Sequence, residues 1–362
     1  MNNYKISALT FSFIIICLID TNLLSTIFPF LISKTKYSFI YSLILVFIIG
    51  LLFLLLFLKV FSTLPDKNII EKVNIVLPKP FSKTINLLLS LLVLLIVIIT
   101  FFKFSTFVSS EYLTNTPTFM ICILLSIPIF IAMFKDIDLA GRCATLIVLT
   151  TMILFFFSRI SLSTTIKIEN LKPILFDDSV FLNSLITSVL HLSPLFASLI
   201  IPKNNIINNR KIWIYLLVTY ILSFLMIAII VITIIGILGV ELSSLYTYPS
   251  YVVLKNLNVL NFIKNVENFS VLFWIMFMSY MCAFGLFYIK TYIITDYNIK
   301  KQKTLNMLMS IIFLSVLLII YLILPYENSL NNHILFSVYI PCIIYALFMF
   351  TSSFLFIFRS FR

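Results

Sequence analysis

The first apolar stretch of the chain, Ile6–Ile32, is long enough to cross a lipid bilayer, yet polar residues interrupt it near its middle. The hydrocarbon core of a bilayer is about 30 Å thick, and roughly 20 helical residues span it. The interruption is Asp20-Thr21-Asn22, and an ionised carboxylate at that depth costs roughly 2.5 to 3.5 kcal/mol. Non-helical backbone at membrane depth is tolerated where it lies inside the protein or lines a wet cavity. The stretch therefore predicts a discontinuous helix that holds part of a binding site. The alternative is an Asp20 that is neutralised or paired for packing.

The composition is that of a polytopic membrane protein. Of the 362 residues, 62% are hydrophobic and only 10% are charged, whereas about 25% of residues are charged in soluble domains. The two histidines are too few for a His-rich metal site, and the five cysteines are scattered without a CxxC pair or metal spacing. No catalytic motif is present. We therefore expect no enzyme activity, no cofactor and no bound metal.

The apolar segments divide the chain into ten predicted spans within one transmembrane domain, residues 1–362. A short interfacial helix is predicted over Asn68–Val76, and another short helix within the loop Tyr246–Lys264. The predicted spans are Ile6–Ile32, Tyr37–Phe61, Thr84–Val108, Phe119–Phe134, Ala144–Phe157, Val180–Ile201, Ile212–Val240, Phe269–Ile289, Leu305–Leu324 and Ile334–Phe358.

A second interruption, His191-Leu192-Ser193-Pro194, falls at the centre of the sixth span. Proline lacks a backbone donor and clashes with the preceding helical turn, so Ser193 and Pro194 are expected to make this break. Residues 6–158 and 180–358 then form two halves of five spans joined by an external loop, 158–179, and each half begins with its broken span. Five spans per half invert the second half, and paired broken helices in inverted halves indicate a transporter-like site at the membrane midplane.

The net charge of +12 reflects topology. Most lysines and arginines fall in the loops that share a side with the amino terminus. This distribution fits the positive-inside rule with both termini cytoplasmic. The basic residues are spread over short loops, so the charge is a topology signal and predicts no nucleic-acid partner. The expected surrounding of the apolar spans is the lipid bilayer.

Four short motifs carry a family resemblance. Glu111–Pro117 (EYLTNTP) resembles the E-x-L-x-x-T-P pattern of the endospore germination permease family, the B subunits of GerA-type germinant receptors within the amino acid–polyamine–organocation superfamily. Asp138 and Arg142 resemble that family's G-x-E-x-x-x-R pattern, with aspartate in place of glutamate. The remaining two are Asn170-Leu171-Lys172-Pro173, which resembles its N-L-x-P loop, and Glu267 with Trp274, which resemble an acidic residue before a Trp-bearing helix. In one departure from the family, Asp20-Thr21-Asn22 stands where glycine is usual.

The resemblance implies a ten-span fold like that of LeuT-type transporters, with a site between spans one, three, six and eight. It implies a sensor of a small germinant, commonly an amino acid, in the spore inner membrane or cytoplasmic membrane. The implied partners are a larger membrane-bound A subunit and a C lipoprotein. Two other functions stay open: a cation- or proton-coupled secondary transporter of amino acids, with Asp20 or His191 carrying the coupling charge, and a membrane scaffold that binds no ligand.

The candidate residues fall into two groups. Asp20 is expected to bind a ligand's ammonium group or a cation, or else to pair with Lys103. Lys103 itself either extends outward, pairs with Asp20 or receives a ligand carboxylate. His191 either hydrogen-bonds ligand and titrates, or is structural. The candidate ligand contacts are Asp20, Thr21, Asn22, Lys103, His191, Ser193 and Tyr280, and the candidate structural or partner contacts are Glu111, Pro117, Asp138, Arg142, Pro194, Glu267 and Trp274.

Overall fold

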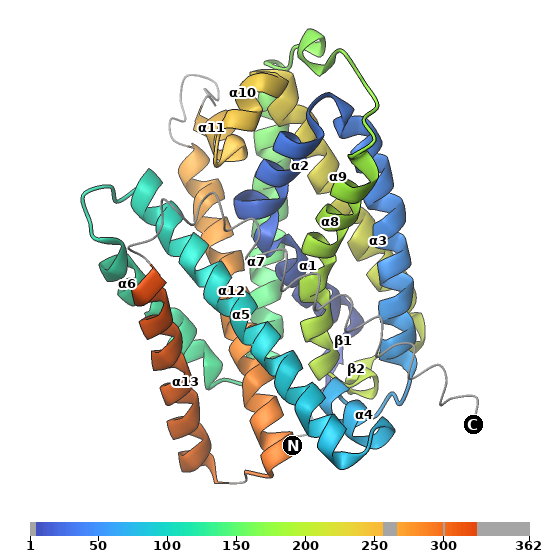
Figure 1. The fold of residues 1–362 in the computed structure, drawn as a ribbon, viewed down its shortest axis with the longest axis vertical. Helices are drawn as coiled ribbons and strands as arrows, with labels where there is room; N and C mark the ends of the chain where they lie inside the picture. The colour runs from blue at the N-terminus through green and yellow to red at the C-terminus, as the bar shows by residue number, and fades with distance from the viewer. Residues whose placement is uncertain (1–4, 256–265, 300, 324–362) are drawn as a thin grey trace.

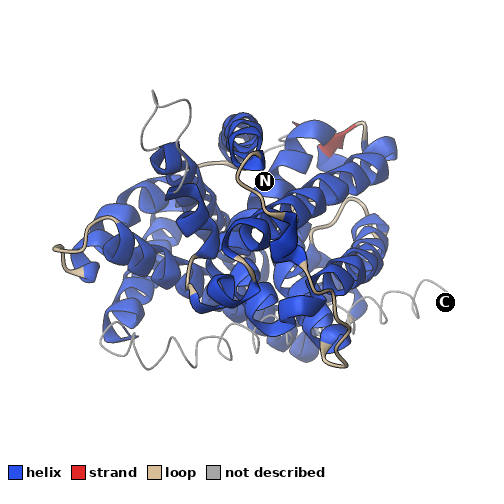
Figure 2. Cartoon of the chain, turned by 90° about the horizontal axis from the view of Figure 1, so that it is seen from above, coloured by secondary structure: helices blue, strands red, loops and turns tan. Residues whose placement is uncertain are grey.

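The computed structural model describes residues 5–255, 266–299 and 301–323, and these residues form a bundle of helices (Figure 1). Seen from above, the described helices pack side by side and are joined by loops (Figure 2). The strands among the described residues are a two-residue parallel pair, β1 (Ile6–Ser7) and β2 (Ile206–Ile207). The all-α architecture predicted from the sequence is confirmed. The tenth predicted span, 334–358, lies outside the described residues.

Within the described ranges, several predicted spans consist of more than one helix. The α-helices are α1 (Ala8–Ile19), α2 (Phe28–Thr35), α3 (Phe39–Ser62), α4 (Ile69–Val76), α5 (Lys79–Glu111), α6 (Thr118–Met133), α7 (Ile137–Ser163), α8 (Val180–Leu192), α9 (Ile212–Leu238), α10 (Val240–Leu245), α11 (Pro249–Lys255), α12 (Val266–Tyr297) and α13 (Gln302–Ile323). The π-helical segment is η2 (Leu23–Ile27). The 3₁₀ segments are η1 (Asp20–Asn22), η3 (Lys36–Ser38), η4 (Ile168–Leu171), η5 (Ser193–Ile200), η6 (Lys203–Asn205) and η7 (Asn209–Lys211).

Seven helical stretches in the described part of the chain are long and apolar enough to cross a membrane. The first of them, Ala8–Ser62, contains the first two predicted spans, and α6 is apolar but shorter than the others. The chain is therefore a polytopic membrane protein, while the count of ten spans stays a prediction. The stretches are Ala8–Ser62, Lys79–Glu111, Ile137–Ser163, Val180–Ile200, Ile212–Leu245, Trp274–Tyr297 and Gln302–Ile323.

The two interrupted spans run in opposite directions through the bundle. At one end, Ile6 pairs with Ile206, so the start of α1 lies beside the segment that follows η5. At the other end, Asn183 Nδ2 near the start of α8 donates to the carbonyl of Lys34 near the end of α2 at 3.4 Å. The segment α1–α2 therefore begins at the end of the bundle where the segment α8–η5 ends, and the two segments are antiparallel.

The short helix predicted over Asn68–Val76 is present as α4, and its position at the membrane interface stays a prediction. Asn68 accepts a hydrogen bond from the backbone of Glu71, whose side chain accepts one from the backbone of Asn68, and this capping box fixes the helix start. Lys72 is 1% exposed. Its Nζ donates to the carbonyls of Val60 at 2.9 Å and Phe61 at 3.3 Å, in the last turn of α3. A lysine at this position satisfies carbonyls that the helix end leaves without partners.

Burial of Lys72, with a smaller contribution from nearby Lys203, lowers the pKa of its ammonium group from 10.5 to about 8. The folded state then binds fewer protons than the unfolded state between these two values, so stability should rise with pH across this interval. We expect a gain of up to about 3 kcal/mol, since one pKa unit corresponds to about 1.4 kcal/mol. Unfolding titrations in mixed micelles from pH 7 to 10.5 measure the gain. Lys72→Met should remove it, whereas Lys67→Met, at an exposed position of the loop before α4, should keep it. Equal pH slopes for the wild type and Lys72→Met would contradict the prediction.

Candidate ligand cavity

The first interruption is a change of helical winding. After α1, one 3₁₀ turn (η1) is followed by a π-helical turn (η2), in which Phe28 N–H donates to the carbonyl of Leu23. Asp, Thr and Asn favour such local changes because their side chains compete for backbone groups. Pro29 has no N–H to give to the carbonyl of Ser25, one helical turn earlier. Lys103 from α5 supplies donors there, bonding Thr26 Oγ1 at 2.9 Å and the Ser25 carbonyl at 3.4 Å.

The second interruption lies where the sequence predicts it. The α-helix α8 ends at Leu192, and the chain continues as the eight-residue 3₁₀ segment η5 with Pro194 in its first turn. Runs of 3₁₀ helix longer than three or four residues are uncommon. Here the 3₁₀ segment completes the apolar stretch, and the chain becomes extended at Ile201. Both breaks therefore replace α-helical hydrogen bonding with tighter or wider turns.

A buried polar cluster joins the two breaks. Ser223 Oγ of α9 donates to Asp20 Oδ1, and His191 Nε2 lies 2.8 Å from the same hydroxyl and 3.5 Å from Asp20 Oδ1. Their exposed fractions are 5% for Asp20, 1% for His191 and 0% for Ser223. The hydroxyl of Ser223 therefore lies between the imidazole of His191 and the carboxylate of Asp20, and the tautomer of His191 decides which atom donates in the contact between His191 and Ser223. Asp20 and His191, far apart in the sequence, thus share one hydrogen-bond chain.

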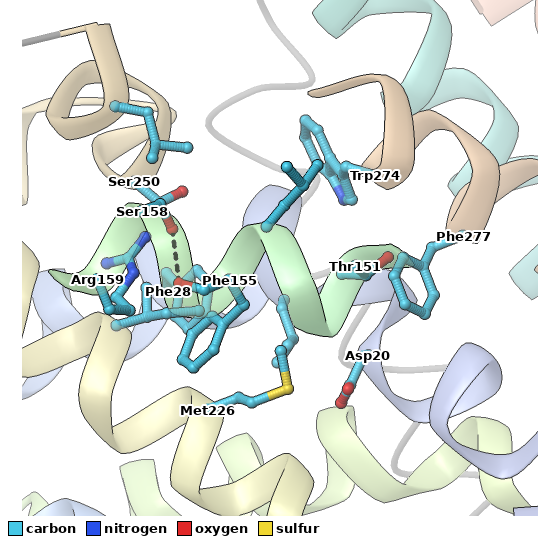
Figure 3. A pocket seen from close by; sticks show the side chains of 14 residues that line it. Asp20, Phe28, Thr151, Phe155, Ser158, Arg159, Met226, Ser250, Trp274 and Phe277 are labelled. Atoms are coloured by element: carbon cyan, nitrogen blue, oxygen red, sulfur yellow. Dashed lines mark hydrogen bonds between the residues drawn. The ribbon is translucent and has the colours of Figure 1, made fainter. Parts of the chain in front are cut away.

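A cavity of about 110 Å³ lies beside this cluster. Its walls come from the first break and from α2, α7, α9, α11 and α12, and Figure 3 shows Asp20 on one side of it and Arg159 on another. Most of its lining is apolar, with a few polar groups, which is the usual character of a small-molecule site. It is lined by Asp20, Leu23, Phe28, Thr151, Leu154, Phe155, Ser158, Arg159, Met226, Ile230, Ser250, Leu254, Trp274 and Phe277.

A sequence profile of a family described as spore germination protein, the spore permeases, matches residues 5–329. The matched range contains both breaks, the polar cluster and every residue that lines the cavity. The chain belongs to the spore germination permease family. No curated protein matches the chain significantly. Membership confirms the family resemblance and places the cavity in a permease-like membrane protein of spore germination.

Within this permease-family bundle, the remaining residues of the first break tie it to α12. Thr21 Oγ1 donates to the carbonyl of Cys17 at 2.6 Å and contacts that of Phe277 at 3.3 Å. Trp274 Nε1 donates to the carbonyl of Thr21 at 3.4 Å, and its ring forms part of the cavity wall. Asn22 is buried beside them. Trp274, expected to be structural, is thus also a cavity residue.

Two predicted ligand contacts lie on other cavities. Tyr280 lines a cavity of about 420 Å³ between α6, α7 and α12. Lys103 lines one of about 270 Å³ between α2, α5 and the segment Ser244–Tyr248. Neither side chain is part of the lining of the cavity that contains Asp20. Ser193, at the start of η5, is buried and follows His191 by two residues.

The residues predicted to be structural occupy helix ends. Glu111 at the end of α5 forms an ion pair with Lys255 of α11, with 3.1 Å between Oε2 and Nζ. The predicted ion pair between Asp138 and Arg142 is confirmed at 2.8 Å on an exposed face of α7. Pro117 directly precedes α6. Glu267 belongs to the first turn of α12.

Four polar cavity residues, Thr151, Ser158, Arg159 and Ser250, were not predicted as site residues. The sequence predicts that the fifth span ends at Phe157, but α7 continues to Ser163 and carries Arg159 on its cavity side. No glycine or proline interrupts the residues from Ser158 to Ser163, and this absence of a helix breaker was the available signal. Ser250 lies near the start of α11, and nothing in its local sequence distinguishes it from the other serines.

Proposed function

We propose that this chain is the B subunit of a germinant receptor, a transporter-like membrane protein that senses a small germinant and signals to partner subunits. The observation that carries the proposal is the cavity bordered by the carboxylate of Asp20, at the point where two interrupted helices meet. Membership of the spore germination permease family supports the same function.

The signal would begin with a change in the first break. A ligand in the cavity would contact η1, α7, α9 and α12 at once. Two of these elements are hydrogen-bonded to the first break: α9 through Ser223 to Asp20, and α12 through Trp274 to Thr21. A ligand shifts a conformational equilibrium only by its differential affinity for the two states. The break, with its 3₁₀ and π turns, is the element whose winding can differ between those states. The altered bundle would then act on the A subunit.

We further propose a LeuT-like arrangement of five plus five inverted spans, with both termini cytoplasmic. In this proposal the chain lies in the spore inner membrane, beside an A subunit and a C lipoprotein. The opposite directions of α1–α2 and α8–η5 support the inverted arrangement. Lys72 of α4 and Lys203 lie at the end that contains the β1–β2 pair, which supports a cytoplasmic assignment for that end.

Spores that lack the gene provide the test. We expect deletion to abolish release of spore contents in response to one class of small solute, with spore yield and heat resistance unchanged, and re-expression of the chain to restore the response. Copurification from spore membranes should recover a larger membrane-bound subunit with the chain. Unchanged responses of the deletion spores to a full panel of amino acids and nucleosides would refute the proposal.

One observation favours a second function, a proton-coupled transporter of amino acids. His191, Ser223 and Asp20 form a buried chain of groups able to hold a proton next to the cavity, as the coupling sites of membrane transporters do. Uptake of radiolabelled amino acids into proteoliposomes, with and without a pH gradient, separates the two functions. Gradient-driven accumulation identifies a transporter, and binding without accumulation identifies a receptor.

A further inference from the structure

The cavity between α6, α7 and α12 is separate from the one that contains Asp20. The helices α6 and α7 each pack on α12 but make little contact with each other (Figure 1). A cavity of about 420 Å³ occupies the space between them. Two of its lining residues, Leu139 of α7 and Met276 of α12, are 42% and 39% exposed, so the cavity opens on the outside of the bundle. Both residues belong to apolar stretches of membrane-crossing length, and the opening therefore faces lipid.

The length and the volume of this cavity match one fatty acyl chain. Its lining on α12 runs from Ile275 to Phe287, which is about 18 Å at a rise of 1.5 Å per residue. Half of a hydrocarbon core about 30 Å thick is about 15 Å, the depth of one leaflet. An apolar cavity of about 150 Å³ holds benzene, so a cavity of about 420 Å³ holds roughly 17 carbon atoms. Most of the lining between its ends is apolar and suits a hydrocarbon chain.

One end of the cavity is polar and carries an excess of positive charge. Lys135 and Asp136, in the connection between α6 and α7, line this end and are exposed. Lys290 of α12 lies next to them, and its Nζ donates to the carbonyl of Phe134 at 3.4 Å. Two ammonium groups thus stand near one carboxylate. Such basic pockets between membrane helices suit the phosphate of an anionic lipid headgroup.

The basic end of the cavity lies at the end of the bundle that contains the β1–β2 pair. Asp296, in the last turns of α12 after Lys290, accepts a hydrogen bond at 2.8 Å from Asn74 Nδ2 of α4. The same helix α4 contacts the last turn of α3 through Lys72. In the orientation proposed above, this is the cytoplasmic end, where anionic lipids attract basic residues.

We infer that the cavity binds an anionic phospholipid from the leaflet at this end. One acyl chain lies between α6, α7 and α12, and the phosphate lies beside Lys135 and Lys290. Inorganic phosphate would leave the apolar part of the cavity empty, and a neutral lipid would leave the excess positive charge without a counterion. The inference concerns a second cavity and goes beyond the proposed function.

The test measures which lipid the full chain retains. The protein is reconstituted in nanodiscs with equal amounts of phosphatidylglycerol and phosphatidylcholine, released into mild detergent and analysed by native mass spectrometry. We expect one retained phospholipid per chain, with phosphatidylglycerol favoured at least fivefold. Addition of inorganic phosphate at millimolar concentration should not displace it, because the acyl chain holds the lipid in place.

A cavity-filling variant tests the position of the acyl chain. Ala140 of α7 is partly buried and lines the cavity, so Ala140→Trp should lower the retained lipid at least tenfold. Leu146→Trp is the matched control, because Leu146 lies on the same helix, is 67% exposed and does not line the cavity. It should retain lipid like the wild type. If Ala140→Trp does not fold, Ala283→Phe fills the same cavity from α12 and takes its place.

A charge variant tests the position of the phosphate. Lys135→Gln should still retain one phospholipid but lose most of the preference for phosphatidylglycerol. Lys79→Gln, at an exposed position at the start of α5 and outside the cavity lining, should keep the preference.

Three results would overturn the inference. They are absence of retained lipid from the wild type, equal retention by the wild type and the folded cavity-filling variant, and an undiminished preference for phosphatidylglycerol in Lys135→Gln. The first result would leave the cavity to a protein occupant. Lipid retention is read on purified protein and the germination response on spores, so the failure of either proposal is distinguishable from the failure of the other.

Discussion

Spores that carry Asp20→Asn are expected to need about 10- to 100-fold more germinant for a half-maximal response. Asparagine keeps the size of the side chain and can still accept from Ser223, but it removes the charge that faces the cavity. A hydrogen bond to a charged group contributes about 1.5 to 3 kcal/mol, which corresponds to that range of affinity. The measurement is a dose–response curve of spore germination, with the amount of the variant determined by immunoblot.

Asp178→Asn is the matched control for this prediction. Asp178 is exposed in the connection between η4 and α8, and substitutions at such surface positions usually change stability by at most about 0.5 kcal/mol. The control should therefore respond like the wild type. A normal response of Asp20→Asn, in a variant that is present at normal levels, would show that Asp20 serves packing and that the ligand binds elsewhere.

The two breaks were predictable because the residues that make them disfavour a continuous helix at membrane depth. A carboxylate at position 20 and a proline at position 194 are both costly inside a span, and each tends to interrupt the helix that contains it. The short helices α4 and α11 were predictable for a similar local reason, since both lie in polar connections with their own apolar residues. Local chemistry alone fixed these features.

The partners of the breaks were not predictable, because they depend on how the helices are rotated and packed. Ser223 is one of many serines in the chain, and only the packing of α9 brings it to Asp20. Tyr280 shows the same limit: it lies with Met276, Ala283 and Phe287 on the stripe of α12 that faces α6 and α7. Helical periodicity groups residues on one face, but it does not say which neighbour that face meets. Arg159 was missed because the end of α7 was placed too early.

Filling the cavity tests its role independently of charge, and Met226→Trp is the variant of choice. Met226 lies on α9, three residues after Ser223, is 9% exposed and lines the cavity. A cavity costs about 24 cal/mol per Å³, so occupying about 110 Å³ recovers at most about 2.6 kcal/mol. Strain from a larger side chain costs about 1 to 3 kcal/mol. The two terms are of similar size, and the melting temperature without ligand should therefore change little.

Ligand binding should respond very differently from stability in this variant. The rigid indole would occupy the space that the ligand needs, so we expect the germination response and calorimetric binding to fall by at least about 100-fold, a loss of about 2.7 kcal/mol. Leu225→Trp provides the control, because the adjacent residue on α9 is 47% exposed and does not line the cavity. It should bind and respond like the wild type. Wild-type responses from a folded Met226→Trp protein would place the ligand outside this cavity, since the indole and the ligand cannot share it.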